Sequence, residues 1–231
     1  MFNLIALVAS LIPAVLTYLW IRNRILNEEK QKLNCRSALK KGLLCAVPVV
    51  FLSLGLDILL NVLKFDNIHP LVKETVYNFV VLAFSEELVK RLMLKKLEKQ
   101  CDYTPGFEET VCYMLIIGLG FEINESILYS FSTNIMQILV RGLLMMHGVF
   151  GYIMGRHLAI SRKTGSRKQA VLSFLLPWLM HGAYDFSLSE QLMEINDNFV
   201  FFPFVLVLIN IIIMIRMFIF LKKTEKSLHA S

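Results

Sequence analysis

The sequence predicts an all-α membrane protein, a polytopic bundle of about seven transmembrane helices. Hydrophobic residues make up 56% of the 231 residues, and the mean hydropathy is +0.59. Apolar runs of roughly 20 residues, each long enough to cross about 30 Å of hydrocarbon, recur along the whole chain. No polar stretch remains for a second domain, so residues 1–231 are expected to form one membrane-embedded domain.

Each apolar run is expected to be helical, because backbone exposed to lipid must satisfy its own hydrogen bonds. The first two runs and the last carry no acid/base motif, whereas the four between residues 71 and 188 that bear acids and histidines form the core of interest. The predicted spans, in order, are 2–21, 42–63, 71–93, 110–130, 135–155, 169–188 and 198–221.

The connecting segments alternate in charge. Lysine and arginine gather in 22–41, in 94–109, in 156–168 and in the tail after 221, whereas the opposite loops contain few basic residues. The positive-inside rule then places the amino terminus outside and the carboxyl terminus in the cytoplasm, in a multi-pass protein of a cell membrane. The pI near 9.1 reflects this topology, so the expected surroundings are a lipid bilayer and not nucleic acid.

Ionisable residues lie inside several apolar runs, where a charge is costly and usually functional. Glu86 and Glu87 are followed by Lys90 and Arg91, each at i,i+4. One interpretation is two ion pairs that ease insertion of a helix end; the other is a carboxylate base oriented by a cation.

Glu122 and Glu125 lie in a segment that contains no lysine or arginine. They either are protonated and hydrogen-bond helices together, or face cations, water or a metal from other helices. Arg141 is expected to be structural, pairing with an acid of the outer loop, although it could hold a substrate carbonyl.

His147 and His181 lie inside two later runs, and Asp185 follows His181 at i,i+4, where a carboxylate can fix the tautomer of the imidazole. A lone intramembrane histidine is often only a core residue. At 1.5 Å per residue, however, Glu87, Glu122, His147 and His181 fall about 12 to 20 Å from the predicted cytoplasmic helix ends. Four helices thus place their ionisable groups at one depth, as a shared polar cavity requires.

Four motifs in this order resemble the PrsW branch of the superfamily of CAAX prenyl endopeptidases and bacteriocin-immunity (abortive-infection) membrane proteins. The match covers roughly 71–188. An FExxE motif, where CAAX endopeptidases have FxxxH, favours the PrsW side and argues against a prenyl-protein substrate. The motifs are EExxxR or EExxK at Glu86–Arg91, FExxE at Phe121–Glu125, the histidine helix from His147, and HxxxD at His181–Asp185.

The resemblance implies an intramembrane endopeptidase, a hydrolase that cleaves a membrane-spanning regulatory protein such as an anti-sigma factor in a bacterial plasma membrane. It implies that Glu86 is the general base, with Glu87 and Arg91 holding the geometry. His147 and His181 would stabilise the oxyanion or bind a metal, and Asp185 would orient His181.

Whether a metal takes part is left open by the sequence. Glu122 or Glu125 could join His147 and His181 as ligands of a zinc ion. The HExxH spacing of familiar zinc proteases is absent, and a glutamate-activated water without metal is slightly preferred.

Two other functions fit the same residues. A catalytically silent immunity or scaffold protein would bind a partner within the bilayer, and an ion-coupled transporter also places acids and histidines at mid-depth. Retention of both glutamates and both histidines argues against the first, and the lack of a convincing internal repeat argues against the second. The substrate's identity and the oligomeric state are not indicated by the sequence.

Overall fold

The computed structural model describes residues 4–26, 28–65, 68–131, 135–189, 192 and 201–229. Within these ranges the chain is helical almost throughout and contains no strand, in agreement with the predicted all-α class. The helices are α1 (Leu4–Trp20), η1 (Ile21–Ile25), α2 (Glu29–Leu44), α3 (Ala46–Val62), α4 (Pro70–Val76), η3 (Tyr77–Ala83), α5 (Phe84–Glu98), α6 (Phe107–Tyr129), α7 (Ile135–Leu144), α8 (Met146–Thr164), α9 (Arg167–Ser187) and α11 (Phe202–His229).

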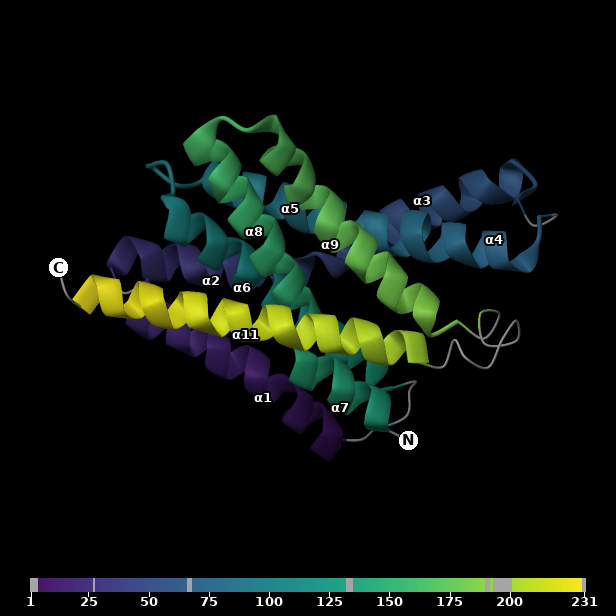
Figure 1. Cartoon of the computed structure of the whole chain (residues 1–231), viewed down its shortest axis with the longest axis horizontal. Coiled ribbons are helices and arrows are strands. Elements are labelled where there is room, and N and C mark those ends of the chain that lie inside the picture. Colours follow the sequence, from purple (N-terminus) through teal and green to yellow (C-terminus); the bar gives the residue numbers. More distant parts are fainter. Residues whose placement is uncertain are drawn as a thin grey trace.

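Helix α6 is the centre of the bundle, packed between α8 and α2 (Figure 1). Its residues from Thr110 to Glu122 are all buried, which explains why this apolar helix has no polar face. Helices α1 and α11 lie across one side, and α3 with α4 projects from the other end of the molecule. The site helices α5, α6, α8 and α9 therefore share one interior.

Four helical stretches of the described residues are long and apolar enough to cross a membrane: Leu4–Ile25, Glu29–Val62, Phe107–Tyr129 and Phe202–Leu228. The predicted spans 71–93, 135–155 and 169–188 are not among them, because they are interrupted or carry the charged residues. The count of seven spans thus stays a prediction. Many apolar side chains along α3 and α11 are exposed, as expected for surfaces that contact lipid.

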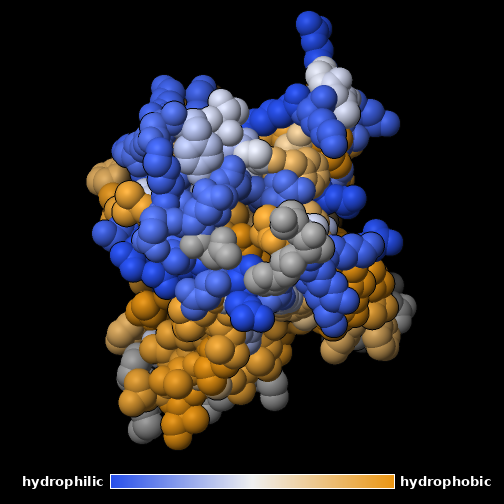
Figure 2. Space-filling model, turned by 90° about the vertical axis from the view of Figure 1, so that its left-hand side faces the viewer, coloured by the Kyte–Doolittle hydropathy of each residue, from blue (hydrophilic) through white to orange (hydrophobic). Residues whose placement is uncertain are grey.

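One end of the molecule is polar. The last turn of α11 and the α5–α6 and α8–α9 connections lie at this end, and the first residue of α1 lies toward the opposite end (Figure 1). Figure 2 faces the polar end and shows hydrophilic residues over most of it, with hydrophobic surface at its lower edge. This arrangement is compatible with the predicted alternation of basic and non-basic connections.

Two predicted boundaries are wrong. Segment 22–41 is not a simple connection, because Glu29–Leu44 forms helix α2 along α6. Its buried face consists of the small residues Cys35, Ala38 and Gly42, which permit close approach; a Cβ at Gly42 would lie 2.8 Å from the Cα of Gly120. The other faces of α2 carry polar residues, so the sequence of this helix contains no long apolar run that would indicate its packing.

The predicted span 135–155 is also not one helix. It is broken at Met145, whose φ is 44°, so that α7 ends at Leu144 and α8 begins at Met146. A positive φ is unfavourable for a residue with a side chain, so tertiary packing must hold Met145 there. The break places the free N–H groups of a helix N-terminus in the protein interior, next to His147.

We expect Gly118→Ala to lower the free energy of unfolding by about 1 to 3 kcal/mol through overpacking. A Cβ at Gly118 would lie 2.1 Å from the backbone oxygen of His147, so α6 and α8 would have to separate. Thermal unfolding in detergent measures the change. Gly55→Ala is the control, because a Cβ at Gly55 on α3 has no neighbour within 4 Å; equal effects of both substitutions would contradict the expected contact.

Candidate active site

The seven predicted acids and histidines meet in the interior of the bundle. Glu86 and Glu87 come from the first turn of α5, Glu122 and Glu125 from α6, His147 from the start of α8, and His181 and Asp185 from α9. The two imidazole rings are edge to face, with their centroids 5.0 Å apart. The expectation of a shared polar cluster on four helices agrees with this geometry.

Glu86 is the carboxylate that points at both histidines. Its Oε2 lies 3.7 Å from Nε2 of His181 and 4.0 Å from Nε2 of His147. This oxygen is buried and accepts no hydrogen bond from the described protein groups. Leaving a buried acceptor unsatisfied is unfavourable, so the position is suited to a bound water, a metal ion or a substrate group.

Glu87 is held firmly instead. Its Oε1 accepts a hydrogen bond from Nζ of Lys90 at 2.6 Å and contacts Nδ1 of His181 at 3.0 Å. The Lys90 ammonium also lies 2.9 Å from Nδ1 of His147 and 4.9 Å from the centroid of the Phe121 ring. Lys90 is completely buried, so it links the acid pair to a histidine of another helix.

This arrangement corrects the predicted role of Arg91. The Arg91 guanidinium donates to the hydroxyl of Ser173 on α9 and not to Glu87. Lys90 and Arg91 differ by about 100° in direction, and the rotation of α5 turns Lys90 toward Glu87 and Arg91 toward Ser173 on α9. Lys90 thus lies at i,i+3 from its partner Glu87. The predicted i,i+4 pairing of Glu86 with Lys90 is replaced by the contact of Lys90 with Glu87.

Glu122 and Glu125 each have a partner from another helix. Glu122 Oε2 accepts the backbone N–H of His147 at 2.9 Å and thereby caps the interior start of α8. Glu125 pairs with Nη2 of Arg141 at 2.8 Å and contacts Nε2 of His147 at 2.6 Å. The sequence left two interpretations of these acids open. The structure agrees with the second, in which the two acids face groups from other helices.

His181 is fixed at both ring nitrogens. Nδ1 faces Glu87, and Nε2 lies 3.0 Å from Oδ2 of Asp185, as the i,i+4 spacing predicted. The ring of Phe150 stacks on it at 5.4 Å between centroids, and Phe121 packs edge-on against His147 at 4.8 Å. These aromatic rings wall the imidazoles off from lipid and limit their movement.

A cavity of about 210 Å³ between α3 and α6 reaches this cluster. Glu86 and Glu125 line its inner part, and Val50 and Leu128 are among the apolar residues that line the rest. Water or an extended peptide could reach Glu86 through it.

Comparison with known proteins identifies the family. The model of the PrsW family intramembrane metalloproteases matches residues 35–215, which include every residue described above. The chain belongs to this family. It is an intramembrane protease, as the resemblance predicted. The placement in a wider superfamily with CAAX endopeptidases stays a prediction.

Several curated PrsW proteases are similar to the chain over most of both lengths. "Protease PrsW" of Oceanobacillus iheyensis is 28% identical over 180 residues, covering 76% of this chain and 78% of the relative. That of Clostridioides difficile is 27% identical over 194 residues, covering 79% and 78%. That of Halalkalibacterium halodurans is 32% identical over 145 residues, covering 61% and 64%. No solved structure matches the chain.

The family description calls its members metalloproteases, and the cluster has a donor set that could hold a metal ion. Glu86, His147 and His181 each offer a ligand atom, and these atoms lie within 4.8 Å of one another. Two histidines and one glutamate are a common ligand set of catalytic zinc. Among the described residues the glutamate of this ligand set is Glu86. The expected ligands Glu122 and Glu125 instead contact His147 and Arg141.

Proposed function

We propose that the protein hydrolyses a peptide bond of a single-span membrane protein, such as an anti-sigma factor, with water activated at Glu86. The observation that carries the proposal is the buried Oε2 of Glu86, which has no hydrogen-bond partner among the described residues and faces two imidazole rings. An attacking water needs such a site, because it must sit between a base and the groups that stabilise the developing charge.

The neighbouring residues would keep this geometry fixed. In a metal-free reaction, Glu86 would take the proton of the water and return it to the leaving amine; with a metal bound, Glu86 would serve as a ligand and not as the base. Lys90 and His181 hold Glu87, and Asp185 fixes the ring of His181. Glu122, by capping α8, sets the position of His147. The two histidines then face the carbonyl oxygen or hold the metal.

Glu86, His147 and His181 would hold the metal, for which zinc is the best candidate by ligand type. When bound, it would supply a Lewis acid for the scissile carbonyl. The slight preference for metal-free chemistry is therefore reversed, since the family is described as metalloproteases and the donor set fits.

The membrane orientation is also a proposal. The polar end in Figure 2 would lie in the cytoplasm, so that the carboxyl terminus is inside and the amino terminus outside. The bacterial curated relatives support a bacterial plasma membrane. Glu86 would then lie within the bilayer, where a membrane-spanning substrate can reach it laterally.

We expect a chelator to abolish cleavage of a single-span, anti-sigma-factor-like substrate by the purified protein, and added zinc to restore it. His181→Ala should lose both the activity and the bound zinc, because it removes a ligand and the partner of Asp185. The measurements are product formation on gels and metal content by mass spectrometry.

His157→Ala is the matched control, because this second histidine of α8 contacts Gln169 and lies outside the cluster. Full activity of zinc-free protein in chelator would favour a glutamate-activated water without metal. Absence of cleavage by the wild type across several substrates, with binding retained, would favour the silent membrane binder.

A further inference from the structure

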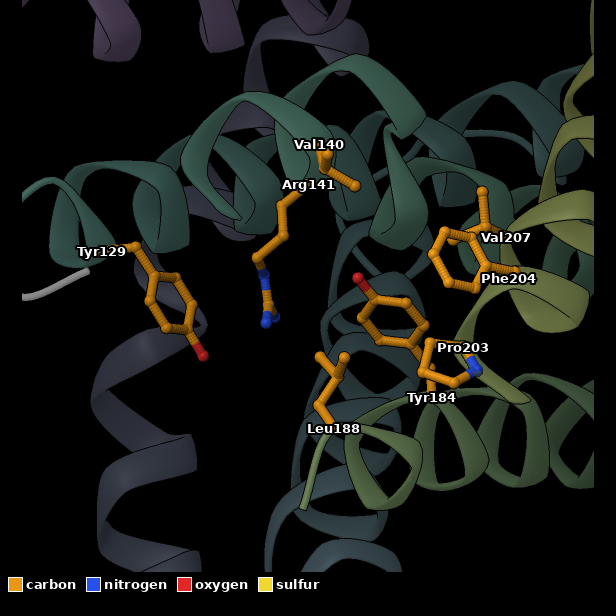
Figure 3. Close-up of a pocket in the computed structure, with 8 residues that line it drawn as sticks. All are labelled: Tyr129, Val140, Arg141, Tyr184, Leu188, Pro203, Phe204 and Val207. Atoms are coloured by element: carbon orange, nitrogen blue, oxygen red, sulfur yellow. The ribbon is translucent and has the colours of Figure 1, made fainter. Parts of the chain in front are cut away.

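A second cavity, of about 310 Å³, lies beyond the catalytic cluster between the ends of α6 and α9 and the helices α7 and α11. Figure 3 shows its walls: Tyr129 on one side, Tyr184 and Leu188 on another, and Phe204 and Val207 on the third. The Arg141 side chain extends between them, with its guanidinium pointing into the space. The cavity is therefore an apolar chamber with one cationic group.

The chamber connects to the catalytic cluster through two direct contacts. Arg141 Nη2 is 2.8 Å from Oε1 of Glu125, and the other oxygen of Glu125 is 2.6 Å from Nε2 of His147. Tyr129 lines this chamber and also the smaller cavity that contains Glu86. The two cavities thus share Tyr129 as a lining residue, one turn along α6 from Glu125.

A peptide cleaved at Glu86 must continue on both sides of the broken bond. Residues of an extended peptide advance about 3.3 Å each and point alternately to opposite sides. A substrate lying in the smaller cavity would therefore direct a flanking side chain past Glu125 into the chamber. The chamber's volume is about ten times the volume that one molecule occupies in liquid water, which is enough for a large apolar side chain.

The guanidinium favours a peptide over a lipid chain as the occupant. A hydrocarbon tail gains nothing from a cation in its path, whereas a peptide carbonyl accepts a hydrogen bond from one. Arginine carries five N–H donors, more than one carboxylate oxygen can accept. The aromatic and aliphatic walls then select the side chain that follows the carbonyl.

We propose that this chamber is the specificity subsite of the protease, receiving a large apolar side chain such as Leu or Phe beside the scissile bond. The proposal rests on the proposed function, since it assumes that peptide is cleaved at Glu86. Shape and apolar area of the chamber, not a charge on the substrate, would select the cleavage position within a membrane-spanning segment.

The test uses the full chain in detergent with quenched apolar peptides that differ at the residues flanking the cleaved bond, which mass spectrometry locates. We expect kcat/KM to be about 10- to 200-fold higher with Leu or Phe than with Ala at one flanking position. Val207→Trp fills the chamber and should remove this preference while the Ala peptide is still cleaved.

Val205→Trp is the matched control, because Val205 lies on the same helix with half of its surface exposed and does not line the chamber. Val207→Ala enlarges the chamber and should shift the preference toward Trp, which tests the subsite with a variant that adds no bulk. The inactive Glu86→Gln variant should bind the Phe peptide more tightly than the Ala peptide.

Equal rates for the Ala, Leu and Phe peptides would overturn the subsite and leave the protease intact. A preference that survives Val207→Trp unchanged would place the subsite elsewhere and overturn it as well. If the wild type cleaves no peptide, the proposed function fails and the subsite falls with it.

Discussion

Glu86→Gln is expected to lower kcat/KM by about 10²- to 10⁴-fold, the usual contribution of a positioned general base. The amide has the shape of the carboxyl group but cannot take a proton from water. The same change should leave the fold intact or stabilise it, because it removes a buried negative charge whose Oε2 accepts no hydrogen bond from the described residues. Cleavage kinetics and thermal unfolding, measured on one preparation, test both halves of this expectation.

Glu108→Gln is the matched control, since Glu108 is an exposed acid in the first turn of α6. It should change neither activity nor stability. If Glu86→Gln keeps activity within a few-fold of wild type, the base must be another group. Glu87 is then the next candidate, because its Oε2 is also buried and has no partner in the described part of the chain.

The same variant separates the protease from its alternatives. A silent immunity or scaffold protein would bind its partner as well with glutamine as with glutamate, and its wild type would cleave nothing. A transporter would lose ion coupling without ever releasing a fragment. A protease alone gives both results: the wild type releases a fragment of the substrate, and the Glu86→Gln variant binds the substrate without releasing one.

The assembly of the site could be predicted because helix geometry alone supplies most of it. Residues at i,i+4 share a helix face, so the contact of Asp185 with His181 could be predicted. Equal depth on alternating helices predicted that the histidines lie near Glu86 and Glu87. The choice between Lys90 and Arg91 could not be predicted. Both follow the acid pair, and which of them faces inward depends on the rotation of α5 against its neighbours.

The break at Met145 had no sequence signal, because neither glycine nor proline marks it. Without the break, Glu122 has no helix start to cap, so its role was also hidden. Arg141 reaches Glu125 from a different helix, and such pairings depend on how α6 and α7 pack. Tertiary contacts, not local patterns, decide these three features.

Lys90→Met is expected to be the most destabilising single change at the site, by about 3 to 5 kcal/mol, because it removes the ammonium that neutralises the buried Glu87 and leaves that carboxylate only its contact with His181. Both side chains of this ion pair are completely buried. The substitution also removes the donor to His147, so activity should be lost. Thermal unfolding in detergent and peptide cleavage measure the two effects, with Lys95→Met on the exposed side of the same helix as the control.

The double variant Glu87→Gln with Lys90→Met decides whether Lys90 acts only on stability. Removing both charges together leaves no buried carboxylate without its ammonium, so most of the stability should return. Activity should not return, because Nδ1 of His147 still lacks the ammonium and Nδ1 of His181 no longer faces a carboxylate. Recovery of both stability and cleavage would show that the pair is structural, and the positioning of the two histidines would then depend on Glu125 and Asp185.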